Sequence, residues 1–353
     1  MAETSASKLS KRIQTDGVTY YKSASAPANI VTGDIWYDTN QNIMKVYNGT
    51  DFDTLSNVLF AVTGGTQTSY TGYEVATFTS SGTFTPNIDG EVDVLLVGGG
   101  GGGGAGRGGG GGGGGMVYRT GLAVSGGTAY TITVGAGGSG STGNDIPTEA
   151  TNGEDTVAFS ITAKGGGRGG SGVNGTTAVS EGDEGGSGGG TTHGADGPKA
   201  SNQASFSGWT SKGNAGGNGD GSNNEAAGGG GGAGAAGQAG ASSGQGGNGG
   251  NGFQNDYQTG SNQYYGGGGG GGAGSGPSPI TSGSGGLGGG GAGSGGTYTD
   301  GAGTSQSAPT VGSANTGGGG GGGVYDTNNA NFATSWNQGA NGGSGIVVIR
   351  WAV

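Results

Sequence analysis

Side chains that could do acid–base or metal chemistry are few and widely separated in this chain. The single histidine, His193, lies in the sequence Thr-Thr-His-Gly, and the chain contains no cysteine. A catalytic triad or a zinc site needs partner side chains at suitable spacing, and none is visible near this residue. We therefore interpret His193 as a loop residue and expect no metal site around it.

Carboxylates gather at one place, where Glu181, Asp183 and Glu184 lie within four residues. A solvated turn is favoured over a carboxylate pair for glycoside hydrolysis, although weak Ca²⁺ binding stays open. The segment 216–220 resembles a calcium-binding nonapeptide repeat, but Asp220 falls one position early and the unit is not repeated. The sequence thus predicts no enzyme activity and no cofactor.

Phosphate-binding signatures carry little information here. Matches to G-x-G-x-x-G are abundant in so glycine-rich a chain, and Lys164 precedes a glycine run rather than following one as in a P-loop. Arg107 and Arg168 stand alone among glycines, as in RNA-binding segments, but the net charge is −11. An acidic surface repels phosphate backbones, so we expect no nucleic-acid partner.

Aromatic side chains interleaved with Asn, Gln, Ser and Asp are the residues best suited to recognition. They fall in the stretches of low glycine content, which we expect to form loops at the ends of a glycine-rich scaffold. Some of these rings could instead close the scaffold as a small core, and both interpretations stay open for each one. The candidates for receptor contact are Phe206, Trp209, Tyr257, Tyr264, Tyr265, Tyr298, Tyr325, Phe332 and Trp336.

The glycine runs must position these loops. Residues 98–353 hold 94 of the 102 glycines, and glycine costs about 1 kcal/mol per residue in a helix interior. Flexible linker is one interpretation. The other is an extended helix with three residues per turn, favoured by the spacing of Gly231, Gly234, Gly237 and Gly240. Such helices have no internal hydrogen bonds, so we expect a compact lattice of antiparallel helices bonded side to side, or no order.

Strand patterns lie at both ends of the chain. Residues 1–60 predict a short β-module, with a hairpin formed by Asp34–Asp38 and Ile43–Asn48, that is too small for a large core and needs a partner chain. Residues 61–75 read as a linker. Residues 76–353 read as the glycine-rich domain, in which the apolar runs 92–97 and 346–351 should meet in one sheet. The predicted fold is all-β: the short module, then a β-sandwich-like domain with packed polyglycine II helices and long loops.

Residues 76–353 resemble the glycine-rich domain of bacteriophage tail-fibre and tail-adhesin proteins. The resemblance rests on ordered motifs: Gly-Thr-Phe-Thr at 82–85, Val-Asp-Val-Leu-Leu-Val at 92–97 before polyglycine, Tyr-Thr-Ile-Thr-Val at 130–134, and Gly-Ile-Val-Val-Ile-Arg-Trp at 345–351. Residues 33–50 are similar to short modules of phage virion proteins. The resemblance implies a homotrimeric virion fibre, attached to tail or baseplate proteins through residues 1–60. Its glycine-rich part would contact a glycan or protein on the host cell surface.

Three other functions stay open at this stage. An ice-binding protein would carry regular Thr or Ala on one lattice face, a pattern present only at 233–241. A non-adhesive virion structural or decoration protein and a glycan depolymerase are the others, the last disfavoured by the scarcity of clustered carboxylates. Neither a signal peptide nor a membrane span is predicted, so we expect synthesis in the host cytoplasm and no membrane insertion.

Overall fold

The chain consists of two compact units, Met1–Leu59 and Phe60–Val353, which we describe separately. The computed structural model describes the residues in the following ranges: 13–15, 18–55, 59–142, 148–172, 181–192, 197–221, 226–274, 281–299, 302–324 and 338–353. Regular secondary structure in these ranges consists of β-strands, in agreement with the all-β prediction.

The first unit is a single five-stranded sheet of strand order β1-β2-β3-β4-β5. Strands β2 and β3 pair in parallel, and the other neighbours pair antiparallel. The antiparallel pairing of β3 with β4 confirms the predicted hairpin. The strands are β1 (Ile13–Thr15), β2 (Val18–Ser23), β3 (Ile35–Asp38), β4 (Ile43–Tyr47) and β5 (Phe52–Leu55).

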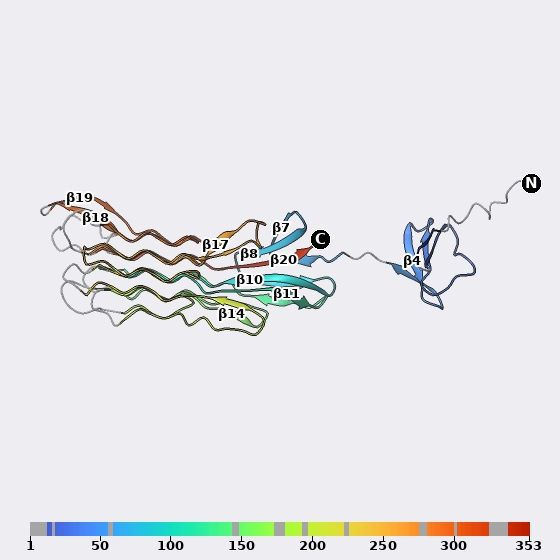
Figure 1. Ribbon diagram of the computed structural model, residues 1–353, viewed down its shortest axis with the longest axis horizontal. Helices are drawn as coiled ribbons and strands as arrows, with labels where there is room; N and C mark the ends of the chain where they lie inside the picture. The colour runs from blue at the N-terminus through green and yellow to red at the C-terminus, as the bar shows by residue number, and fades with distance from the viewer. Residues whose placement is uncertain are drawn as a thin grey trace, which may run out of the picture. The chain divides into compact units, whose positions relative to one another are not determined.

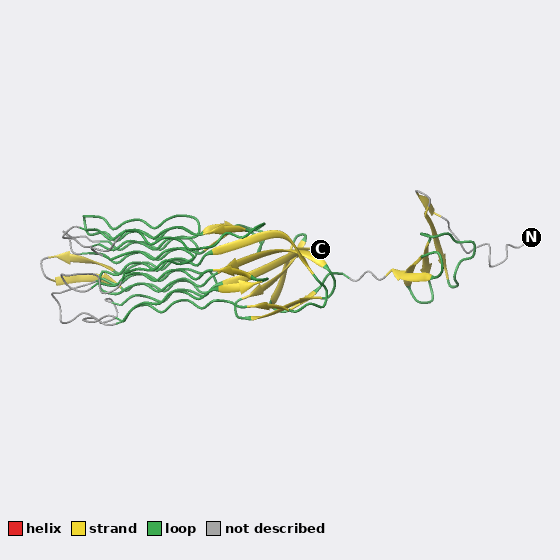
Figure 2. Ribbon diagram, turned by 90° about the horizontal axis from the view of Figure 1, so that it is seen from below, coloured by secondary structure: helices red, strands yellow, loops and turns green. Residues whose placement is uncertain are grey.

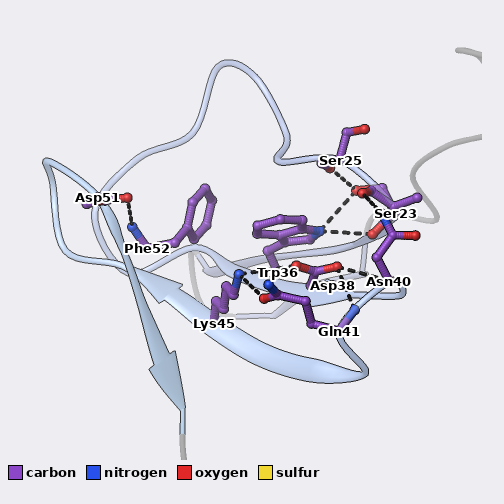
Figure 3. A network of polar contacts seen from close by, with 10 residues as sticks. Ser23, Ser25, Trp36, Asp38, Asn40, Gln41, Lys45, Asp51 and Phe52 are labelled. Atoms are coloured by element: carbon purple, nitrogen blue, oxygen red, sulfur yellow. Dashed lines mark hydrogen bonds and ion pairs between the residues drawn. The ribbon is translucent and has the colours of Figure 1, made fainter.

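A polar network organises one face of this sheet (Figure 3). The buried Trp36 donates from Nε1 to the carbonyl oxygen of Ser23 at 3.2 Å, and Phe52 lies edge-on to its ring. Asp38 accepts the backbone N–H groups of Asn40 and Gln41 at 3.0 and 3.2 Å, and it pairs with Lys45 at 3.1 Å. Burial alone raises the pKa of Asp38, but these hydrogen bonds and the Lys45 charge hold it below its ordinary value.

The second unit is built on a six-stranded sheet of order β15-β11-β10-β20-β8-β7. The predicted meeting of the two apolar runs is confirmed, since Leu95 of β10 lies opposite Val348 of β20. The two runs are central strands, and their side chains are buried on both faces. In sheet order the strands are Thr210–Lys212, Met116–Val124, Gly90–Val97, Ile346–Ala352, Tyr73–Phe78 and Thr66–Tyr70.

Each face of this sheet has its own core. One face is covered by a small three-stranded sheet and by a hairpin. In the small sheet, Phe84 and Ile132 pack against Val94 and Leu96 of β10. The strands of the small sheet are β6 (Val62–Thr63), β9 (Gly82–Pro86) and β12 (Tyr130–Ile132), and those of the hairpin are β13 (Thr156–Ala158) and β14 (Ile161–Ala163). The other face packs against the hairpin of β16 (Phe253–Asn255) and β17 (Gln263–Tyr265). The arrangement is sandwich-like, as predicted.

Beyond the sheet, the glycine runs form a lattice of extended segments that lie side by side (Figure 2). Along residues 98–104 the backbone N–H groups donate in rotation to three antiparallel neighbours, and their carbonyl groups accept from three parallel ones. The six neighbours are 109–115, 151–154, 340–343, 138–141, 166–169 and 320–323. Because each direction recurs every third residue, the run is a helix of three residues per turn. The lattice mixes parallel and antiparallel neighbours, which corrects the purely antiparallel expectation.

The lattice leaves no space for side chains inside. A Cβ atom added to Gly101 would lie 2.2 Å from the carbonyl oxygen of Gly167, and one added to Gly112 would lie 2.1 Å from that of Ser187. These two positions therefore have to be glycine, although small side chains such as those of Ser187 and Ala227 are also buried in the lattice. The flexible-linker interpretation is wrong for the glycine runs that the structure describes.

Side chains replace missing helix neighbours at the rim of the lattice. The Asn248 side-chain oxygen accepts the backbone N–H of Ser284 at 2.8 Å, and the hydroxyl of Thr310 accepts that of Ala292 at 2.7 Å. The amide oxygen of Asn341 accepts the N–H of Gly140 at 2.8 Å. These bonds satisfy backbone donors at the edge that would otherwise be left to water.

The segment expected to be a linker, residues 61–75, is part of this second unit. Strand β6 pairs with β9, β7 pairs with β8, and the unit begins at Phe60. The structure differs from the expectation because Thr-rich strands satisfy their backbone groups by pairing, although their composition resembles that of a linker.

Candidate functional site

The aromatic candidates nearest the sheet have mainly structural surroundings. Phe206 and Trp209 are half-buried against the core of the six-stranded sheet. Tyr257 and Tyr265 are buried in the core on the opposite face, with only 4% and 3% of their surface exposed. Tyr264 is 37% exposed, because neighbouring residues of a strand point to opposite faces. Of these five, Tyr264 is the ring most accessible to a receptor.

One further aromatic candidate among the described residues belongs to the other end of the unit. Tyr298 lies in β18 (Gly295–Thr299), which pairs with β19 (Ala302–Ser307) at the end farthest from the six-stranded sheet (Figure 1). A turn at residues 105–107 marks the same end, since it joins the outgoing run 98–104 to the returning run 108–115. Tyr325, Phe332, Trp336 and His193 lie outside the described residues.

A buried arginine holds the β16–β17 hairpin to the sheet. The guanidinium of Arg350 bonds from Nε to Asp93 at 2.9 Å and from Nη1 to the Tyr70 hydroxyl at 2.8 Å. It lies 3.3 Å from Asp256 and stacks over the Tyr257 ring at 4.1 Å. Burial by itself lowers the pKa of Arg350, but the bonds to Asp93 and Tyr70 raise it above its ordinary value overall. The cluster therefore keeps its charge and fixes the hairpin.

The two buried tyrosines of the hairpin are held in their neutral form. Burial raises the pKa of Tyr265 to about 12, and its hydroxyl donates to Gln258 Oε1 at 2.6 Å. Burial also raises the pKa of Tyr257, with a further contribution from the negative charge of Asp93. Because both phenol groups are neutral and buried, Tyr257 and Tyr265 stabilise the hairpin and do not belong to its exposed surface.

A hollow of about 430 Å³ lies where β7 and β8 meet the β16–β17 loop. We call it the threonine hollow. Its lining residues carry hydroxyl or amide groups, and none of them is charged: Thr66, Thr68, Ser69, Tyr70, Thr77, Thr79, Gln258 and Thr259. A second hollow of about 250 Å³ adjoins it and shares Thr66, Thr77 and Thr79 with it.

Sequence reasoning missed most of the threonine hollow, because four of its lining residues fall in the segment interpreted as a linker. A signal was present in the alternation of Thr66, Thr68 and Tyr70, which is the period of a strand with one face toward the protein. Gln258 and Thr259, in contrast, lie in one of the loops expected to contact a receptor.

Two of the three carboxylates in the acidic cluster 181–184 form ion pairs. Asp183 pairs with Arg168 at 3.0 Å, Glu181 pairs with Lys199, and Glu149 also contacts Arg168. These pairs join neighbouring segments of the lattice. Within the ranges that the structure describes, no group of three metal-ligating side chains is found.

Comparison with known proteins gives one family. A family model described as a glycine-rich domain matches residues 78–352, from the end of β8 to that of β20. A search of the curated proteins finds no match. In the described part of the chain no helix is long and apolar enough to cross a membrane.

Proposed function

Because this chain belongs to the family of glycine-rich domains over residues 78–352, and because its motifs resemble those of phage adhesins, we propose that it is a phage tail-fibre protein that contacts the host surface. In this proposal the lattice is a rigid support, the chain is a virion component, and the receptor is a glycan or protein on the host cell.

One observation carries the proposal. The glycine-rich unit has two ends, and between them lies a lattice whose helices are hydrogen-bonded to neighbours in every lateral direction. The six-stranded sheet closes one end, while the turn at 105–107 and the β18–β19 hairpin lie at the other (Figure 1). Each interior helix is held by six neighbours, so loops at the far end are displayed on a platform that does not bend easily. That is the mechanical requirement of an adhesive tip.

The first unit has a sheet face that is suited to attachment. One face of its sheet carries Tyr20, Ile35, Tyr37, Met44 and Leu55, and the last two are 41% and 43% exposed. An apolar patch of this kind on a small unit favours association with another chain. We propose that residues 1–60 join this chain to other copies, as a homotrimer, and to tail or baseplate proteins.

Receptor contact is assigned first to Tyr298 of β18 at the far end, and the exposed Tyr264 of β17, at the sheet end, is a second and separate contact. In this assignment Tyr264 and Tyr298 contact the receptor, together with Tyr325, Phe332 and Trp336. The buried positions of Tyr257 and Tyr265 favour a supporting role for these two rings. An ice-binding role gains no support from the rim, where Gln238, Asn248 and Ser284 interrupt any regular Thr or Ala face.

Adsorption of the parent particle tests this function. Particles carrying Tyr264→Ala with Tyr298→Ala should adsorb to host cells about tenfold more slowly than wild type, since aromatic anchors dominate binding energies. Particles with Leu287→Ala serve as the control, because this side chain is 54% exposed and belongs to neither β17 nor β18. Equal adsorption of both variants, together with failure of the purified protein to compete with particles for cells, would overturn the proposal.

A further inference from the structure

We propose that the threonine hollow and the hollow adjoining it form one binding site for an uncharged oligosaccharide. This inference rests on the proposed function for its class of ligand, a glycan of the host surface, and adds a binding site separate from the proposed tip at the far end. The site lies at the sheet end of the glycine-rich unit, away from the β18–β19 hairpin at the far end (Figure 1).

The lining favours a neutral ligand with both C–H and hydroxyl groups, because most of its accessible surface is apolar and the remainder is hydroxyl and amide. Threonine and serine hydroxyls both donate and accept hydrogen bonds, and Gln258 adds an amide. The lining residues carry no charge that would pair with a phosphate, carboxylate or ammonium group. The threonine methyl groups and the Tyr70 ring provide apolar contact for the C–H faces of a sugar ring.

The dimensions fit a chain of sugars better than a single small molecule. The threonine hollow has a volume of about 430 Å³, within the range of roughly 300–1,000 Å³ that is usual for ligand sites. The adjoining hollow extends it past Gly64, Gly65 and Gly82. A Cβ on Gly64 would lie 1.9 Å from the Thr83 carbonyl oxygen, and its φ of +102° suits glycine, so the backbone itself borders the second hollow.

The walls of the site are fixed before any ligand arrives. The Gly260 N–H donates to the carbonyl oxygen of Asp256 at 2.8 Å, and the Thr259 hydroxyl donates to that of Ser261 at 3.1 Å. A Cβ at Gly260 would lie 2.8 Å from the Tyr70 ring, which shows how closely the loop packs on β7. With Arg350 holding the loop, little ordering entropy is lost on binding.

The position of the hollow on the sheet favours a sugar over a peptide strand. Strand β7 is the last strand on this side of the sheet, so an extended peptide could add to its edge. A strand added there would lie beyond β7, whereas Thr77 lies on β8, between β7 and β20. Thr66 and Thr77 are directly opposite each other, so an occupant that touches both lies on the face of the sheet.

The test is binding of neutral hexaoses to the full-length protein, followed by saturation-transfer NMR and calorimetry. The panel comprises hexamers of glucose, mannose, galactose and N-acetylglucosamine, with a hexagalacturonate as the charged control. At least one neutral hexaose should bind more tightly than the charged one. Thr68→Val should weaken it about fivefold through loss of one hydroxyl. Thr68→Phe, which fills the hollow, should abolish binding.

Thr120→Val and Thr120→Phe are the matched controls, because Thr120 is an exposed threonine of β11, which β10, β20 and β8 separate from β7, and it lines neither hollow. They should leave affinity unchanged. The inference fails if no neutral hexaose binds at millimolar concentration, if the Thr68 variants bind as wild type does, or if only a Thr- and Ser-rich peptide binds. A different outcome is that Thr68→Phe abolishes hexaose binding but particles that carry this variant adsorb normally. That result would support the oligosaccharide site and show that the site does not act in adsorption.

Discussion

A single methyl group inside the lattice provides the sharpest test of how this fold is held together. In Gly101→Ala the new Cβ would lie 2.2 Å from the Gly167 carbonyl oxygen and 2.6 Å from its carbon, far inside the 3.4–4 Å of ordinary contact. The run 98–104 cannot simply move away, because it has a bonded neighbour in every lateral direction. The clash must therefore be relieved by breaking lateral hydrogen bonds.

The size of the effect follows from those bonds. Residue 101 donates to Gly112 at 2.9 Å and accepts from Gly320 at 2.9 Å. Loss of two such bonds costs about 2 kcal/mol, and overpacking adds about 1–3 kcal/mol, so unfolding should become easier by about 3–5 kcal/mol. In Gly221→Ala no atom lies within 4 Å of the new Cβ, and the expected change is at most about 0.5 kcal/mol in either direction.

Guanidinium unfolding followed by near-ultraviolet circular dichroism measures both variants, and hydrogen exchange locates the change. Amide protons of the central runs should exchange faster in Gly101→Ala and at the wild-type rate in Gly221→Ala. If the two variants had the same unfolding free energy within 0.5 kcal/mol, close backbone packing would not be what stabilises the lattice.

Three further predictions concern the charged and phenolic groups. Arg350→Met should destabilise the second unit by about 3–5 kcal/mol, because it leaves Asp93 without its partner, and Arg350→Met with Asp93→Leu should recover most of the loss in the same unfolding assay. Because burial raises the pKa of Tyr265 to about 12 from 10.0, the stability that it contributes is complete below pH 10 and is lost as pH rises toward 12. Tyr265→Phe should flatten that alkaline limb, and an unchanged limb would refute the assignment. The pKa of Asp38 is below its ordinary 3.8, so its contribution to the first unit is present above that pH and is lost as pH falls through the lower folded value. Asp38→Asn should remove this acid sensitivity in fluorescence-monitored acid unfolding, whereas Asp51→Asn, at an exposed position, should retain it.

Much of the architecture could be predicted from local pattern. The apolar runs at 92–97 and 346–351 predicted central strands that pair with each other, and the structure confirms both points. The threefold helix was predicted, but the glycine spacing used for it was misleading. The chain turns at residues 233–235, where Gly232 N–H donates to the Ala235 carbonyl, so Gly231 and Gly240 lie on two antiparallel segments rather than along one helix. The prediction of a linker at residues 61–75 was wrong. Thr66–Tyr70 has the composition of a loop, and it forms a strand because it pairs with β8.

The candidate site was less predictable. Aromatic residues in glycine-poor stretches are natural recognition candidates, but a sequence does not say which ring of an adjacent pair faces the core. Tyr264 and Tyr265 differ in this way, and only the register of β17 against β16 separates them. The threonine hollow combines residues almost two hundred positions apart, Thr68 and Gln258, so no local pattern contains it.

By itself, the sequence determined that an ordinary side-chain core was excluded from the glycine-rich region, so that the region either packs backbone against backbone or has no order. It also determined that strands would close the glycine-rich region at one end. Tertiary structure decided which glycine runs become neighbours and whether they lie parallel or antiparallel. Any glycine run can form the same lateral backbone hydrogen bonds with any other run, so the bonds themselves do not specify the partner. The partners are fixed only in the complete lattice, whose rim is closed by side-chain hydrogen bonds. For the same reason tertiary structure decided which hydroxyl-bearing strand and which loop would share a hollow.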